Sequence, residues 1–121
     1  MLTLYEKNSV GKIIDYLTKI QENYQSELNM VENDIKRTNR LIKDAEKSKK
    51  EVQSSLDTSY MVLSSSQVAK SQEFAEIDSF VELIELRKKE LDDLNHKKII
   101  VEGRLAEVNE IINCAEDLKR G

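Results

Sequence analysis

An uninterrupted apolar repeat, with alternating steps of four and three residues, runs from Val10 to Leu63. Twelve of its sixteen positions are apolar, and no proline interrupts it. The positions are Val10, Ile14, Leu17, Gln21, Tyr24, Leu28, Val31, Ile35, Thr38, Ile42, Ala45, Lys49, Val52, Leu56, Ser59 and Leu63. Because a 3.5-residue repeat keeps one narrow apolar stripe facing a partner helix, it is typical of a coiled-coil seam. The repeat therefore predicts an all-α chain.

A second stripe of the same period follows between Ile77 and Ala115, and ten of its twelve positions are apolar. These positions are Ile77, Phe80, Ile84, Arg87, Leu91, Leu94, Lys98, Val101, Leu105, Val108, Ile112 and Ala115. Between the stripes, the serine-rich residues 64–71 favour a turn. We therefore expect a single domain that forms a long antiparallel two-helix coiled-coil hairpin, with helices over about 12–63 and about 72–118.

Facing residues of two antiparallel helices have numbers with a constant sum, and a sum of about 136 aligns these stripes well. The apolar pairs that it predicts are Tyr24 with Ile112, Leu28 with Val108, Val31 with Leu105, Ile35 with Val101, Ile42 with Leu94, Ala45 with Leu91, Val52 with Ile84 and Leu56 with Phe80. The polar seam residues also meet, Thr38 with Lys98 and Lys49 with Arg87. Polar layers of this kind fix the register of a coiled coil at a cost in stability. A register that is slipped by one layer remains open. For Lys49 and Arg87, the alternative is a third element or a partner that covers them.

Three features mark the expected helix ends. Thr3 and Glu6 have the spacing of a capping box, and Ser71 is a candidate N-cap for the second helix. Gly11 weakens its turn, so the first helix is expected to fray before about residue 12. In the predicted register, about residues 1–15 extend past the second helix. Such an apolar overhang is either frayed or docked on another protein.

Composition limits the function. Charged residues make up 35% of the 121 residues and apolar residues 39%, with a net charge of −4. The negative charge argues against general nucleic-acid binding, which needs an excess of Lys and Arg. No apolar run is long enough to cross a membrane, and the N-terminal residues do not form a signal peptide. One cysteine cannot form an internal disulfide, which fits a reducing, cytoplasmic compartment.

No catalytic, cofactor or metal site is predicted. The single histidine, His96, and the single cysteine, Cys114, are separated by about 27 Å of helix at 1.5 Å per residue. They can neither form a catalytic pair nor share a metal ion. Gly11 and Lys12 lack the other residues of a phosphate-binding loop. The chain is therefore expected to act through protein contacts.

Two charged segments are the candidate contact sites. Residues 36–50 carry seven Lys or Arg residues against two acidic ones, whereas residues 72–86 carry five acidic residues and no basic one. The basic segment is either a solvated flank of the coiled coil or a docking surface for an acidic partner. Its seven basic residues are Lys36, Arg37, Arg40, Lys43, Lys47, Lys49 and Lys50.

Residues 74–83 read FAEIDSFVEL and residues 87–94 read RKKELDDL. Together with the small size and the expected hairpin, these segments resemble the FliJ/YscO family, the central stalks of flagellar and type III secretion export ATPases. The match covers the hairpin in shape but only about residues 74–95 in residue detail. The chain lacks the strongly basic ends of several flagellar members.

The resemblance implies a stalk without an active site, similar to the coiled coil of the rotary ATPase gamma subunit. It would insert into a homohexameric export ATPase, stimulate it and connect it to the export gate. Without these partners, the chain would be a monomer. Secretion chaperones are further partners that the family implies. The implied gate contacts are Phe80, Ile84 and Leu91. The nominated ATPase contacts are Lys36, Arg37, Arg40, Lys43, Lys47 and Lys50.

Two other functions fit the same sequence features. The first is a secretion chaperone or adaptor that binds an effector through the apolar overhang. The second is a coiled-coil sensor or dimerisation module, for which residues 101–112 of the second helix would also be suitable. A stalk would stimulate an ATPase, a chaperone would copurify with an effector, and a dimerisation module would self-associate.

Overall fold

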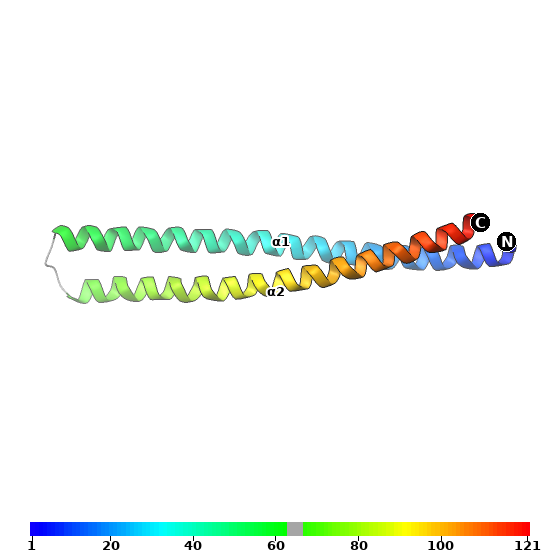
Figure 1. Cartoon of the computed structure of the whole chain (residues 1–121). Coiled ribbons are helices and arrows are strands. Elements are labelled where there is room, and N and C mark those ends of the chain that lie inside the picture. The colour runs from blue at the N-terminus through cyan, green and yellow to red at the C-terminus, as the bar shows by residue number, and fades with distance from the viewer. Residues whose placement is uncertain (63–66) are drawn as a thin grey trace. The chain divides into compact units, whose positions relative to one another are not determined.

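The computed structural model describes residues 1–62 and 67–121, with side chains for residues 1–56 and 73–121. It contains the helices α1 (Leu4–Val62) and α2 (Gln67–Arg120), which pack against each other, and no strand among the described residues (Figure 1). The predicted all-α two-helix fold is therefore confirmed. Residues 64–66 of the expected turn lie outside the described residues.

Contacts divide the chain into two compact units, each with a segment of both helices. The first unit comprises residues 1–33 and 95–121, and the second comprises residues 34–94. In each unit the predicted seams form the core. All ten buried residues among the described side chains belong to the two predicted stripes. They are Leu28, Val31, Thr38, Ile42, Ala45, Leu56, Ile84, Val101, Val108 and Ile112.

The pairing of the helices in the first unit differs from the predicted register. The Gln21 Nε2 donates a hydrogen bond to Asn109 Oδ1 at 2.5 Å, and Lys98 Nζ lies 3.9 Å from Glu32 Oε1. A Cβ atom at Gly11 would lie 3.3 Å from Lys119 Nζ. The residue numbers of all three pairs add up to 130 instead of 136. The predicted pairing of Leu28 with Val108 is therefore wrong.

The observed and predicted registers differ by about one heptad, and the seven-residue repeat explains the difference. A shift of seven residues returns every seam position to a seam position, so the apolar stripes fit equally well in either register. The predicted register was chosen to align polar seam residues. In the structure, Lys98 lies near Glu32 and Glu102 instead, because a lysine stem can carry its ammonium group out to the edge of the seam.

The core of the second unit agrees with this shift. Ile42, Ala45 and Ile84 form one buried cluster, and Leu91 packs against it. The predicted register placed Ile84 opposite Val52, one heptad away from Ala45. The expected layer of Lys49 and Arg87 belongs to the sum of 136. In the structure, Arg87 Nη1 donates to both carboxylate oxygens of Glu90 at 2.9 and 3.2 Å.

Both helices begin earlier than expected. At α1, the predicted capping box is confirmed. The Glu6 backbone N–H donates to Thr3 Oγ1 at 3.1 Å, and Glu6 Oε1 accepts from the Thr3 backbone N–H at 3.3 Å. This cap starts the helix at Leu4, so the expected fraying up to residue 12 is wrong. Because α2 begins at Gln67, Ser71 lies inside the helix and is not its N-cap.

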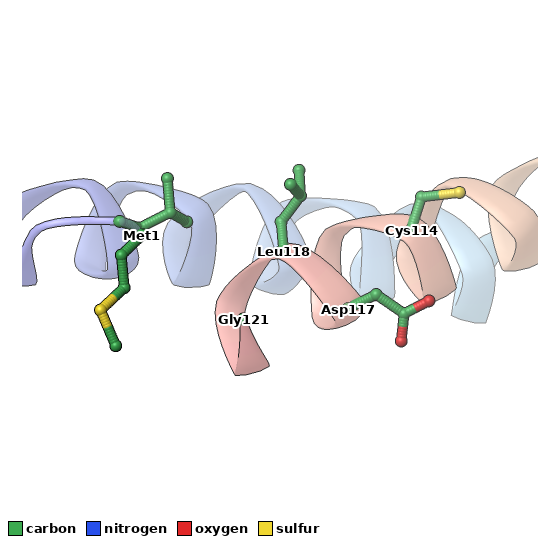
Figure 2. Close-up of a pocket in the computed structure, with 6 residues that line it drawn as sticks. Met1, Cys114, Asp117, Leu118 and Gly121 are labelled. Carbon is green, nitrogen blue, oxygen red and sulfur yellow. The ribbon is translucent and has the colours of Figure 1, made fainter.

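The predicted overhang of residues 1–15 is shorter in the structure. With a sum of 130, Gly121 is level with residue 9, so only about residues 1–8 extend past α2. Gly11 lies next to Lys119. Met1 lines an open hollow of about 680 Å³ together with Cys114 and Leu118 (Figure 2). Residues 10–15 of α1 therefore lie beside α2, whereas Leu4 and Tyr5, which lie beyond its end, are 77% and 80% exposed.

Thiol crosslinking tests the register. With Cys114→Ser as background, Gln21→Cys combined with Asn109→Cys is expected to crosslink within one chain much faster than Gln21→Cys combined with Ala115→Cys. A short bifunctional thiol reagent discriminates the two because residues 109 and 115 are about 9 Å apart along α2. The readout is the mobility of the monomer on a denaturing gel. Faster crosslinking of the second pair would restore the register predicted from the sequence.

Truncation of a seam residue tests the core. Val101 is 1% exposed, whereas Ile99 on the same helix is 69% exposed. We expect Val101→Ala to lower the free energy of unfolding by about 2 kcal/mol, because it removes buried methyl groups and leaves a cavity. Ile99→Ala is expected to change it by less than about 0.5 kcal/mol. Urea denaturation followed by circular dichroism measures both, and equal effects would contradict the assigned core.

Candidate functional site

The basic residues of the second unit form a stripe along α1. Lys36, Arg40, Lys43, Lys47 and Lys50 follow one another in steps of four, three, four and three residues. Each is one or two residues past a seam position, so the stripe follows the seam on the outer side of the helix. All five side chains, and the neighbouring Arg37, are exposed. Five of the six nominated ATPase contacts thus share one face, whereas Arg37 lies about 100° around the helix from Lys36.

The positive charge of this stripe is largely uncompensated. Arg37 pairs with Asp34 at 3.4 Å, but both side chains are well exposed and such pairs contribute little to stability. The five stripe residues make no ion pair among the described residues. Exposed like charges in a row attract an oppositely charged surface more strongly than isolated ones do. The stripe is therefore suited to an acidic partner.

An acidic stripe lies on the outer side of α2 in the same unit, and the sequence reasoning missed it. Asp78, Glu82, Glu85 and Asp92 are exposed and follow the same stepping, with Lys89 at the one remaining position. The acidic excess of residues 72–86 is visible in the sequence, but composition does not give the side of the helix on which it lies. Counting from the seam would have found it. The second unit consequently has one basic and one acidic outer face.

A small hollow lies beside the basic stripe. Lys49, Lys50 and Lys88 line it together with Glu46, Gln53 and Ile84, and its volume is about 310 Å³. Lys49 is half-buried here, although it occupies a seam position. Its ammonium group adds to the positive charge at the end of the stripe.

The three gate residues implied by the resemblance occupy different environments. Ile84 is 8% exposed and belongs to the buried cluster, and Leu91 packs against that cluster. Phe80 is half-buried and lines a hollow of about 430 Å³ with Ala75, Glu76 and Ser79. Phe80 and Leu91 are therefore both partly accessible, and Phe80 also borders a hollow that another protein could fill.

The remaining candidates carry no assembled chemistry in the described part of the chain. No group of three or more His, Cys, Asp or Glu side chains is arranged there to hold a metal ion. His96 and Cys114 lie on different turns of α2, and Cys114 is exposed. Among the described residues, neither helix has a segment apolar enough to cross a membrane.

Comparisons of this chain with protein family models, with curated proteins and with solved structures find no match. The site is therefore interpreted from its own geometry and charges.

Proposed function

We propose that this chain is a non-enzymatic central stalk of a type III secretion system. It inserts into a homohexameric export ATPase in the cytoplasm, stimulates ATP hydrolysis and links the ATPase to the export gate. Two features support the proposal. One is the resemblance of residues 74–95 to the FliJ/YscO stalks, and the other is a fold of two packed helices.

The observation that carries the ATPase contact is the basic stripe on α1. Five exposed cations within fifteen residues, without ion-pair partners among the described residues, favour an acidic lining on the hexamer. The proposed stalk has one basic and one acidic face, whereas the six ATPase subunits are chemically identical. A single stalk therefore contacts the subunits unequally and favours different states in them.

Such unequal contact is sufficient for stimulation. A ligand shifts a conformational equilibrium only by its difference in affinity for the states. A basic face on α1 and an acidic face on α2 give the second unit two different affinities for one subunit surface. The stalk would thereby stabilise one subunit state on one side and another state on the other side, with no catalytic group of its own.

For the gate contact, the candidate beside a hollow is Phe80. Ile84 and Leu91 would act indirectly, by holding α2 against α1 so that Phe80 keeps its position. A gate protein would fill the hollow beside Phe80 with an apolar side chain, because an aromatic ring in a pocket is a frequent anchor of protein interfaces.

Charge reversal tests the ATPase contact. We expect Lys43→Glu, Lys47→Glu and Lys50→Glu together to reduce the stimulation of a homohexameric export ATPase from the same cells by about tenfold or more, because attraction becomes repulsion. The measurement is the ATP hydrolysis rate at substoichiometric stalk, at several salt concentrations. Circular dichroism should show unchanged helicity, since all three side chains are exposed.

The acidic stripe supplies a matched control. Asp78→Lys, Glu82→Lys and Glu85→Lys reverse three exposed charges on α2 and are expected to leave more of the stimulation intact. Full stimulation by the α1 triple variant would remove the charge assignment. The absence of any stimulation by the unaltered chain would remove the stalk proposal itself.

A further inference from the structure

A second apolar surface, separate from the seam, lies in the first unit. Ile13, Tyr16, Ile111 and Leu118 are 54%, 66%, 52% and 59% exposed. Cys114 is also exposed, and Ile20 is half-buried. We call these six residues the lateral face. Large apolar side chains that are exposed as a group mark interaction surfaces more often than isolated ones do.

The six residues share one side of the helix pair. Each immediately precedes a position of the four-three repeat, as Ile13 precedes Ile14 and Ile111 precedes Ile112, when the repeat is continued from Ala115 to Lys119. In an antiparallel pair, the positions that precede the seam on both helices lie on the same flank. Figure 2 shows the side chains of Cys114 and Leu118 pointing to one side of α2, whereas Asp117 points elsewhere.

The two helices contribute to this flank at the same level. Because facing residue numbers in the first unit add up to 130, residues 13–20 of α1 lie beside about residues 110–117 of α2. The lateral face is therefore continuous across both helices. The opposite flank at this level is polar, with Asp15, Thr18, Asn109 and Glu116.

Charges of opposite sign border the lateral face. Lys12 and Lys19 follow its edge on α1, whereas Glu110 and Asp117 follow its edge on α2. All four side chains are exposed, and none makes an ion pair among the described residues. Both pairs have a spacing of seven residues. With the observed register, Lys12 is level with Asp117 and Lys19 with Glu110 to within one residue, or about 1.5 Å.

We propose that the lateral face binds a second copy of this chain, through a twofold axis parallel to the helices. This operation places α1 of one copy over α2 of the other. Each copy then brings Lys12 and Lys19 opposite Asp117 and Glu110 of the partner copy, so that the same contacts occur twice. The six apolar side chains of each copy form the centre of the interface, and the charges form its rim.

The charge pattern selects this arrangement over its alternative. A twofold axis across the helices would place α1 over α1 of the partner copy, with Lys12 opposite Lys19, and α2 over α2, with Glu110 opposite Asp117. Like charges would then meet at both edges and oppose association. With the axis parallel to the helices, every one of these edge contacts joins opposite charges.

The proposed dimer differs from the expectation of a monomer in isolation, and it does not depend on the proposed stalk function. Its surface lies in the first unit, whereas the basic stripe lies in the second unit. The hydrolysis assay and the association assay can therefore fail separately.

Sedimentation equilibrium of the full chain between about 1 and 300 µM tests the proposal, since this range covers the dissociation constants of weak dimers. We expect a reversible dimer, and Ile13→Glu should raise its Kd by about tenfold or more because it buries a charge in the apolar centre. Ile99→Glu is the matched control, because Ile99 is 69% exposed and lies on the opposite flank. It should leave the Kd unchanged.

Charge reversal tests the orientation with variants that keep the apolar centre intact. Lys12→Glu with Lys19→Glu should raise the Kd, and the further changes Glu110→Lys with Asp117→Lys should restore it. A chain that stays monomeric over the whole range, as expected if a different protein covers the face, would overturn the proposal. Equal effects of Ile13→Glu and Ile99→Glu would also overturn it, as would a lower Kd for the Lys12 and Lys19 variant.

Discussion

The structure depends on the burial of two apolar stripes against each other. Each helix needs the other to cover its seam, because a single amphipathic helix of this kind is not stable alone. The buried residues are few and lie along a line, from Leu28 and Val31 to Val101 and Val108 in the first unit. Every other feature of the chain, including its charged faces, is arranged around this line.

The sequence predicted the seams correctly but not their alignment. All ten buried residues were identified as seam positions, because an apolar period of 3.5 residues indicates which side of each helix packs against the other. The register was wrong by about one heptad. A repeat has the same phase after seven residues, so only particular pairs such as Gln21 with Asn109 distinguish the registers. Such pairs depend on side-chain geometry that periodicity does not contain.

The helix ends and the charged faces also include features that are predictable from the local sequence and features that depend on the register. The capping box of Thr3 and Glu6 was predictable because it is local, whereas the packing of Gly11 beside Lys119 follows from the register. The basic segment was visible as composition, and its arrangement into one stripe follows from counting along the helix. The acidic stripe and the lateral face were equally countable. They were missed because residues next to a seam were treated as a solvated surface.

The one-heptad ambiguity has a physical consequence for the folded molecule. Two antiparallel helices with matching repeats can slide past each other by about 10.5 Å and recover an apolar seam. What opposes such sliding in the first unit is a small set of polar contacts, among them Gln21 with Asn109 and Lys98 with Glu32. The alignment of this helix pair thus depends on a few weak polar contacts. A protein that binds those side chains would allow one helix to slide along the other.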